Sequence, residues 1–315
     1  MRRRIYISTI LVFLLGFTTP AFACVGARPM AMGGAFIAVS DDANATYWNP
    51  AGLSQLEDLE ITYTPTLYNR DEVNYDDFVS FVSPLKIGKQ DFGGLGLSFV
   101  NSGYDFSPLG KTIDRWYWLS YGVKTFDNLS LGTNLRLQCY EEKFLGLRDD
   151  DSIFAVDLAL LWKLNKLSFG ILWQDMNEPE VELFGVKSKF IRNLRPGIAF
   201  RPDEKTTIAL DMYDAAGETK GKPGSVAYDL RLGVERWFDL PEGTSEWLGS
   251  NFALRLGGYH INRSNRAFTF GFGLKGSPEN NLIKDIQLDY TLLYWTDASS
   301  GTDKFTHQLG ISFKF

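Results

Sequence analysis

Most of this chain repeats one pattern, in which apolar residues alternate with polar or small residues over segments of about 9 to 14 residues. The alternation is clearest late in the sequence, where Phe268, Phe270 and Phe272 are separated by Thr269 and Gly271. Successive side chains of a strand point to opposite faces, so each segment predicts a strand with one apolar face. The chain is therefore expected to be all-β.

Turn residues divide this region into about fourteen expected strands, each longer than the usual 5 or 6 residues of soluble sheets. Such lengths suit tilted strands that cross a bilayer. A soluble sandwich would show the same alternation, but two features favour a single transmembrane antiparallel barrel: aromatic residues near strand ends and an alternating C-terminal strand that ends in Phe313 and Phe315. The expected strands are 58–66, 75–84, 91–103, 112–125, 128–142, 151–163, 166–176, 191–201, 205–213, 226–238, 251–262, 266–276, 284–297 and 304–315. The aromatic residues expected in interfacial girdles are Trp116, Trp118, Trp162, Trp173, Trp237, Tyr294 and Trp295.

The connections between these strands alternate in length, as in outer-membrane barrels with short periplasmic turns and longer external loops. Tight turns are expected near 126–128, 164–165 and 202–204, and longer polar loops at 143–150, 177–190 and 214–225. The connections 239–250 and 263–265 do not follow the alternation.

The N-terminus has the features of a secretory leader. Three arginines precede an apolar run, and Ala21-Phe22-Ala23 gives the small-x-small pattern of a signal-peptidase site. Residues 1–23 are therefore expected to be removed during export. Cys24 would then be the first residue, either lipidated or simply exposed by cleavage. Cys139 falls on the outward face of its strand, so no disulfide is expected between the two cysteines.

Composition excludes several classes of function. The net charge of −6 provides no basic field for nucleic acid, and the mean hydropathy of −0.14 is too polar for a helical membrane protein. The two histidines, His260 and His307, lie in no metal-ligand spacing, and no GxSxG motif is present. No catalytic residue, metal or cofactor is therefore expected, although an outer-membrane enzyme is retained as a weak alternative.

Residues 24–56 differ from the rest of the chain because they are irregular, apolar and rich in glycine. Backbone groups without a regular ladder need partners inside some enclosure, so this segment is expected to fill the barrel formed by residues 57–315. Strand parity places a mixed set of charges on the inward face, where they would bind the segment or, alternatively, solvate an open pore. These lumen candidates are Arg136, Asp157, Arg195, Asp211, Arg231, Glu235, Arg255, Lys275 and Asp289.

The same segment resembles the N-terminal signature of the FadL/TodX family of outer-membrane proteins, and most closely its shorter PorV/PorQ-like or UPF0164-like branch. The resemblance rests on Gly26-Ala27-Arg28, Met32-Gly33-Gly34-Ala35, Asp41-Asp42-Ala43-Asn44-Ala45 and Asn49-Pro50-Ala51-Gly52-Leu53. It implies a fourteen-stranded barrel whose lumen holds an N-terminal hatch. The hatch or gating residues are Gly33, Gly34, Asp41, Asp42, Asn44, Asn49, Pro50, Ala51 and Gly52.

Within the hatch, Asp41 and Asp42 are expected to cap a helical turn that Asn49-Pro50 stops, and the amides of Asn44 and Asn49 are expected to bridge the hatch and the wall. A simple turn into the first strand is the alternative for Asn49-Pro50.

The expected function is passive uptake of hydrophobic or amphiphilic small molecules, such as long-chain fatty acids, through a channel in the outer membrane of a Gram-negative bacterium. The alternative is a PorV-like barrel that docks proteins of a secretion or envelope assembly system. The expected partners are outer-membrane lipid, a hydrophobic ligand and the barrel assembly machinery, which would read the C-terminal signal at Phe313 and Phe315. Proteins of a secretion system are the partners in the alternative.

Overall fold

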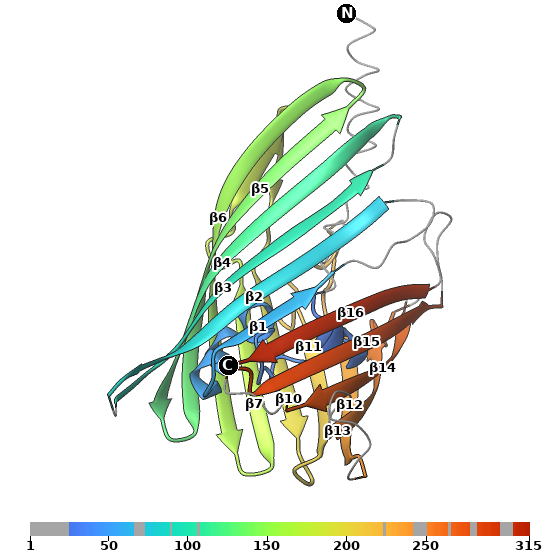
Figure 1. Ribbon diagram of the computed structural model, residues 1–315. Helices are drawn as coiled ribbons and strands as arrows, with labels where there is room; N and C mark the ends of the chain where they lie inside the picture. The colour runs from blue at the N-terminus through green and yellow to red at the C-terminus, as the bar shows by residue number, and fades with distance from the viewer. Residues whose placement is uncertain are drawn as a thin grey trace, which may run out of the picture.

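The computed structural model describes residues 25–65, 73–88, 90–105, 108–222, 225–241, 251–263, 266–277, 282–296 and 305–315. The expected leader and Cys24 lie outside the described residues, as does most of the 239–250 connection. In the described part of the chain, fourteen strands form one closed antiparallel barrel, and a separate two-stranded hairpin lies between two of them (Figure 1). The expected fold class is confirmed.

The strands of the ring follow the chain order, with each one paired to its predecessor. Their bounds are β1 Glu60–Thr64, β2 Val73–Ile87, β3 Gln90–Asp105, β4 Gly110–Phe126, β5 Leu129–Phe144, β6 Leu147–Leu164, β7 Leu167–Gln174, β10 Asn193–Phe200, β11 Thr206–Tyr213, β12 Asp229–Asp239, β13 Asn251–Tyr259, β14 Ala267–Gly276, β15 Asp285–Trp295 and β16 Phe305–Lys314. The extra hairpin comprises β8 (Glu180–Leu183) and β9 (Val186–Lys189).

The last strand closes the ring against the first. Ile61 lies opposite Phe313 and Tyr63 opposite Ile311 in an antiparallel ladder. The backbone amide of Phe315 donates to the carbonyl of Leu59 at 2.9 Å. The alternating C-terminal strand is therefore an integral part of the wall, so that the barrel has no free edge at this closure.

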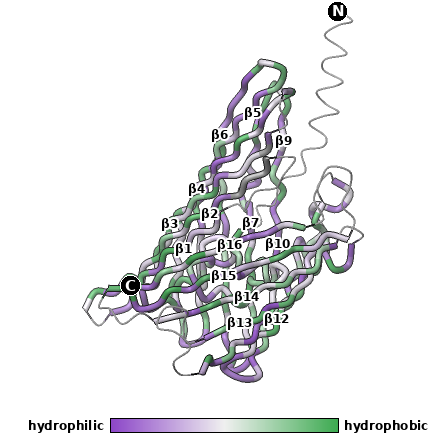
Figure 2. Tube along the Cα trace, turned by 45° about the vertical axis from the view of Figure 1, so that its right-hand side comes forward, coloured by the Kyte–Doolittle hydropathy of each residue, from purple (hydrophilic) through white to green (hydrophobic). Residues whose placement is uncertain are grey.

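The outer face of the barrel is apolar and the inner face is polar or small. On neighbouring strands, Leu254 and Phe270 are 39% and 44% exposed, whereas Arg255 beside them is fully buried. Figure 2 shows the resulting alternation of green and purple along the strands. Because the inward side chains are buried rather than open, the lumen is filled.

Two sequence expectations about the barrel wall are wrong. Trp116, Trp118, Trp237 and Trp295 share the parity of inward residues and point into the lumen, so they cannot form a girdle on the outer face; Trp118 is only 3% exposed. Trp162, Trp173 and Tyr294 do face outward, with 40%, 38% and 38% exposure.

The second error concerns 143–150, which is not a polar loop. There β5 and β6 continue to a two-residue turn at Leu145-Gly146, where both residues have positive φ (48° and 81°).

The barrel wall is taller on one side than on the other. Strands β2 to β6 have 15 to 18 residues, whereas β7, β10 and β11 have 8 each, and the β5–β6 hairpin stands above the rest in Figures 1 and 2. The β8–β9 hairpin covers the inner face of this wall, where Val181 and Leu183 pack in one apolar cluster with Ile153 of β6. No helix in the described ranges has the length and apolar character to cross a membrane.

Candidate functional site: the N-terminal segment and the lumen

Residues 25–56, called the N-terminal segment below, lie inside the ring of strands (dark blue in Figure 1). The segment contains two short helices, α2 (Ala27–Ala31) and α3 (Ala45–Trp48), and a 3-10 helix, η1 (Pro50–Gln55). Gly33 and Gly34 turn the chain after α2 with φ of 64° and 70°. Nearly all of its side chains are buried, and those of Phe36 and Ile37 have no exposed surface.

Polar side chains of β11, β14 and β15 bind the backbone of the first half of the segment. One carboxylate oxygen of Asp211 accepts from the amides of Phe36 at 2.7 Å and Ile37 at 2.9 Å. Thr269 donates to the carbonyl of Ala31 at 2.9 Å, and Thr291 donates to that of Ala27. These bonds satisfy backbone amides and carbonyls of the segment that have no partner in a β-ladder.

The second half of the segment is bound in the same way by the opposite wall, β2 to β6. Asn134 of β5 donates to the carbonyl of Thr46 at 3.0 Å, and the hydroxyl of Thr46 lies 3.1 Å from that of Ser80 on β2. Ser54 donates to Ser130 of β5 at 2.7 Å. The two halves therefore rest against different sides of the barrel.

Asn49 joins both halves to the wall. Its amide nitrogen donates to the carbonyls of Ile37 at 2.8 Å and Leu160 of β6 at 3.1 Å. Its side-chain oxygen accepts from the amide of Ala51 at 3.0 Å, which caps η1 directly after Pro50. Asn49 is fully buried and extended (φ −164°), so α3 stops before it.

A continuous ionic network ties the first half to the wall through Arg28. The Arg28 guanidinium makes a two-pronged contact with Glu235 of β12, at 2.9 and 2.8 Å. Another nitrogen of the same group reaches Asp41 at 2.7 Å and Asp42 at 2.8 Å. Glu235 also accepts from Arg255 at 2.7 Å, and Arg255 pairs with Asp289 at 2.7 Å. Charge-assisted bonds of this kind are the strongest in proteins.

The two aspartates of this network titrate in opposite directions. Burial works against ionisation of Asp41, but the guanidiniums of Arg28 and Arg201 outweigh it, so its pKa is lowered. Burial raises the pKa of Asp42, and Arg28 offsets this effect only in part. As the pH falls, Asp42 is therefore protonated first, while Arg28 keeps Asp41 as an anionic partner.

Glycines of the wall lie directly against the backbone of the N-terminal segment. A Cβ added at Gly132 would lie 2.2 Å from the amide nitrogen of Ala51, and one at Gly257 would lie 2.3 Å from that of Gly33. A Cβ added at four other glycines would lie 2.3 to 2.4 Å from a carbonyl oxygen of the segment; these are Gly94, Gly122, Gly170 and Gly233. We call these six wall glycines the glycine belt. Several are cross-strand neighbours, such as Gly94 and Gly122. Only glycine allows so close an approach of two backbones.

The remaining lumen candidates form separate groups. Arg136 is buried and pairs with Asp157 at 3.1 Å and with Asp175. Arg195 and Arg231 both lie over the ring of Tyr213, and their guanidinium carbons are 4.0 and 3.5 Å from its centroid. Lys275 shares the inward parity but lies at the barrel end, where it is one-third exposed and pairs with Asp285.

Asp41 and Asn44 of the expected hatch set behave differently from the expectation. Asp41 does not cap a helix, because Arg28 binds it. Asp42 accepts from the backbone and side-chain amides of Asn44, each at 2.9 Å, just ahead of α3. Asn44 is thereby held within the segment. The role of Arg28 was not predicted from the sequence, although a single arginine in an apolar buried stretch was a usable signal for a carboxylate partner.

Among the described residues, no cluster of three or more potential metal ligands is present.

Comparison with models of protein families gave no match, and comparison with curated protein sequences gave none. Solved structures do match over nearly the whole chain. A Pseudomonas aeruginosa FadL homologue shares 10% identity at a TM-score of 0.57, covering 93% of this chain and 96% of that one. The CymD monoaromatic hydrocarbon channel shares 13% identity at a TM-score of 0.60, covering 93% of this chain and 97% of that one. The Pseudomonas putida toluene transporter TodX shares 12% identity at a TM-score of 0.57, covering 92% of this chain and 97% of that one.

At these identities the similarity concerns the path of the backbone, which in this chain is a closed ring of fourteen strands. The expectation drawn from the N-terminal motif and the strand count is met at this level. The chain therefore has the fold of the FadL/TodX family of outer-membrane proteins.

Proposed function

We propose that this protein is an outer-membrane channel for hydrophobic or amphiphilic small molecules, with the N-terminal segment as its hatch. In this proposal residues 1–23 are a cleaved leader, residues 24–56 the hatch and residues 57–315 the barrel. The observation that carries it is the filled lumen: inward polar side chains and the glycine belt bind an irregular segment all around the ring. The similar structures described as hydrocarbon channels support the choice of ligand class.

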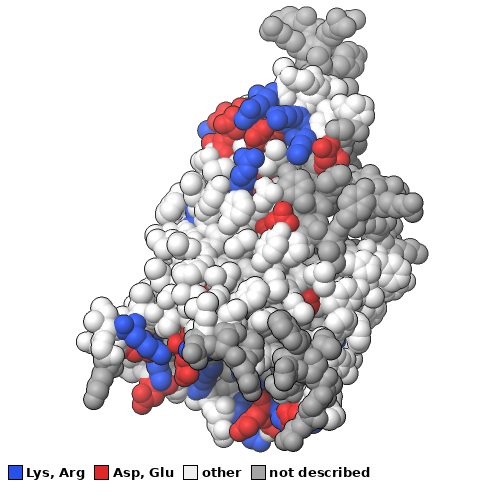
Figure 3. All heavy atoms as spheres, in the orientation of Figure 1, with Lys and Arg blue, Asp and Glu red and all other residues white. Residues whose placement is uncertain are grey.

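The distribution of charge supports a membrane location. On the face seen in Figure 3, charged side chains gather near the two ends, with a mostly uncharged band between them. On the outer face of β5 and β6, large apolar residues such as Leu137, Phe154 and Leu158 are 46%, 52% and 45% exposed. So much exposed apolar surface is unfavourable in water and suits lipid.

Aromatic side chains supply an apolar surface inside the barrel. Tyr140 of β5 stacks on Phe190, the residue that follows β9, with the ring centroids 5.8 Å apart. Trp116 and Trp118 follow on the neighbouring β4, 5.7 Å apart, and Trp118 contacts Tyr47 of the hatch at 5.8 Å. A greasy molecule entering from the loop end would meet these rings before the hatch. Fatty-acid-like ligands remain part of this proposal.

The hatch gives the channel a gate. Its second half continues directly into β1, whereas its first half is attached to the wall by side-chain contacts, above all the Arg28–Glu235 pair. Movement of the first half would break few cooperative hydrogen bonds, because the segment has no ladder. Loss of the Arg28 contacts would therefore open a route along β11 to β15.

Deletion of residues 25–53, with the leader and Leu56 onward retained, tests this function. The shortened protein should still form a barrel, and its single-channel conductance in planar bilayers should rise severalfold. Uptake of a hydrophobic fluorescent probe by cells should rise with it. A folded barrel with unchanged conductance would show that the segment does not occlude the lumen.

The tall wall favours a second candidate, a docking role of the PorV kind. Beyond the apolar band, the outer face of this wall carries an ionic group in which Glu141 contacts Arg115, Lys143 and Arg148. Shortening the β5–β6 hairpin by removing residues 141–148 would take away this group and leave the hatch contacts in place. Loss of export of a secreted protein with normal probe uptake would favour docking over uptake.

A further inference from the structure

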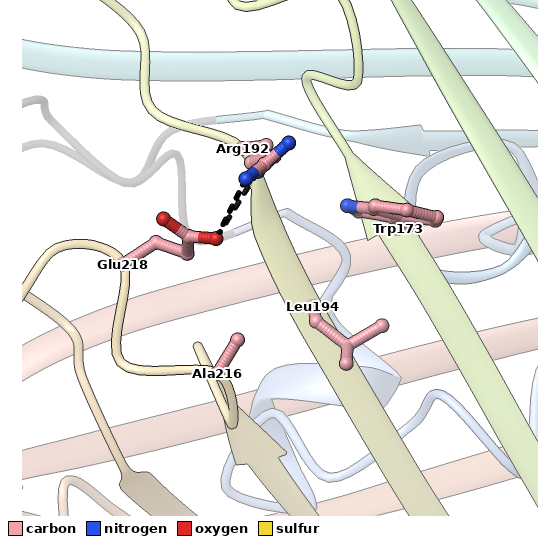
Figure 4. A pocket seen from close by; sticks show the side chains of 5 residues that line it. All are labelled: Trp173, Arg192, Leu194, Ala216 and Glu218. Atoms are coloured by element: carbon pink, nitrogen blue, oxygen red, sulfur yellow. Dashed lines mark hydrogen bonds and ion pairs between the residues drawn. The ribbon is translucent and has the colours of Figure 1, made fainter.

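The barrel carries a groove on its outer face, where β7 ends and β10 begins. Trp173 and Leu194 are cross-strand partners that point away from the lumen. With Ala216, Arg192 and Glu218 they line a cavity of about 280 Å³. In Figure 4 Arg192 and Glu218, joined by a dashed line, lie to the left of the Trp173 ring, and Leu194 lies below that ring.

The loop that forms the second wall of this groove is held in place by a buried residue. Asp214 has no exposed surface and accepts from the amides of Glu218 at 2.9 Å and Thr219 at 2.7 Å. The amide of Asp214 in turn donates to Asn193 at 2.8 Å, and Ala215 donates to the carbonyl of Leu194 at 2.9 Å. Glu218 is thereby fixed beside the strands, so the groove is preformed.

We propose that this groove binds one phospholipid with a zwitterionic head group that carries a primary ammonium. This inference rests on the membrane location in the proposed function. The apolar part, Trp173, Leu194 and Ala216, faces the bilayer and would receive an acyl chain. Arg192 and Glu218 lie at its rim as one positive and one negative group, joined by hydrogen bonds of 3.2 and 3.0 Å.

This pair complements the charges of the head group. Arg192 can bind the phosphate through two N–H groups, and Glu218 can accept from the ammonium. The side chains are 45% and 36% exposed, and an ion pair this exposed contributes little to stability. Rearranging the pair around a lipid therefore costs little. A quaternary ammonium has no N–H to offer Glu218, so it should bind less well.

Tryptophan quenching by lipids with brominated acyl chains tests the proposal. The protein is reconstituted in phosphatidylcholine vesicles containing equal mole fractions of brominated phosphatidylethanolamine or brominated phosphatidylcholine. The fluorescence signal of Trp173 is obtained as the difference between the fluorescence of the wild type and that of Trp173→Phe. We expect the ethanolamine lipid to quench this signal at least twofold more strongly, and Arg192→Gln and Glu218→Gln to remove the preference.

Trp162 supplies the matched control, since it is outward-facing and 40% exposed but lies outside the groove. Its signal, taken from Trp162→Phe, should be quenched equally by both lipids. Equal quenching of Trp173 by the two lipids, with Trp162 quenched normally, would overturn the lipid site alone. If neither lipid quenches Trp162, the barrel is not in the bilayer, and the proposed function falls together with the site.

Discussion

At the scale of single residues, Arg28 is expected to determine how firmly the first half of the N-terminal segment, the proposed hatch, is held. It is 8% exposed and shares its charge among Glu235, Asp41 and Asp42. Replacing one member of a buried ionic group leaves the others uncompensated and typically costs about 3–5 kcal/mol. This cost falls on the hatch, because Glu235 keeps Arg255 as a partner.

Arg28→Gln is therefore expected to raise single-channel conductance, with more frequent open events, while the barrel stays folded. Planar-bilayer recordings measure this effect. Arg148→Gln is the matched control, since it removes an exposed arginine–carboxylate contact at the barrel tip. Equal conductance in Arg28→Gln and the wild type would show that this network does not hold the gate.

Asn49 acts through hydrogen bonds rather than charge. Asn49→Ala removes two donated bonds and one accepted bond, and it leaves the carbonyls of Ile37 and Leu160 without these partners. Each unsatisfied buried group costs about 1–3 kcal/mol. Hydrogen exchange measured by mass spectrometry should speed up at least tenfold over residues 37–53. Asn44→Ala, whose side chain binds only within the hatch in the described contacts, should affect this stretch less; the reverse order would contradict the assignment.

At the scale of elements, the glycine belt matches the barrel wall to the hatch. Gly132→Val would drive a side chain into the backbone at Pro50 and Ala51. The Cβ alone would lie 2.5 Å from the carbonyl carbon of Pro50 and 2.2 Å from the amide nitrogen of Ala51. The expected result is a displaced η1 or a poorly folded barrel, seen as a loss of the heat-modifiable band on gels.

The same substitution made together with deletion of residues 25–53 should be tolerated, because the colliding backbone is absent. Thr133→Val, on the outer face of the same strand, controls for β-propensity. If Gly132→Val disrupts the shortened barrel as much as the intact one, the glycine serves strand geometry rather than the hatch.

At the scale of the whole molecule, the closed ring leads us to expect a barrel that resists unfolding and lies in a membrane. Every strand of the barrel pairs with two neighbours, so unfolding in detergent requires many backbone bonds to break together. The protein should fractionate with outer membranes and migrate differently on gels with and without boiling. Recovery in the soluble periplasmic fraction, with one mobility in both gels, would be incompatible with the barrel in a membrane.

The amino-acid sequence by itself determined the wall of this protein. Alternation with period two is a local property, because neighbouring side chains of a strand must face opposite sides. It therefore predicted fourteen strands and the inward parity of Arg255 and Asp289, whose burial the structure shows. The Gly- and Pro-rich stretch likewise indicated an irregular segment that needs an enclosure.

Only the tertiary structure decided what fills and holds the lumen. Arg28 and Glu235 are 207 residues apart, and no local pattern pairs one arginine with one of many carboxylates. The glycines of the belt are spread over several strands, so their common level appears only once the register is fixed. Trp118 lies inside because its parity and its contact with Tyr47 outweigh the usual preference of tryptophan for the interface. Contacts between distant segments depend on the register of the whole ring, and that is a property of the folded barrel alone.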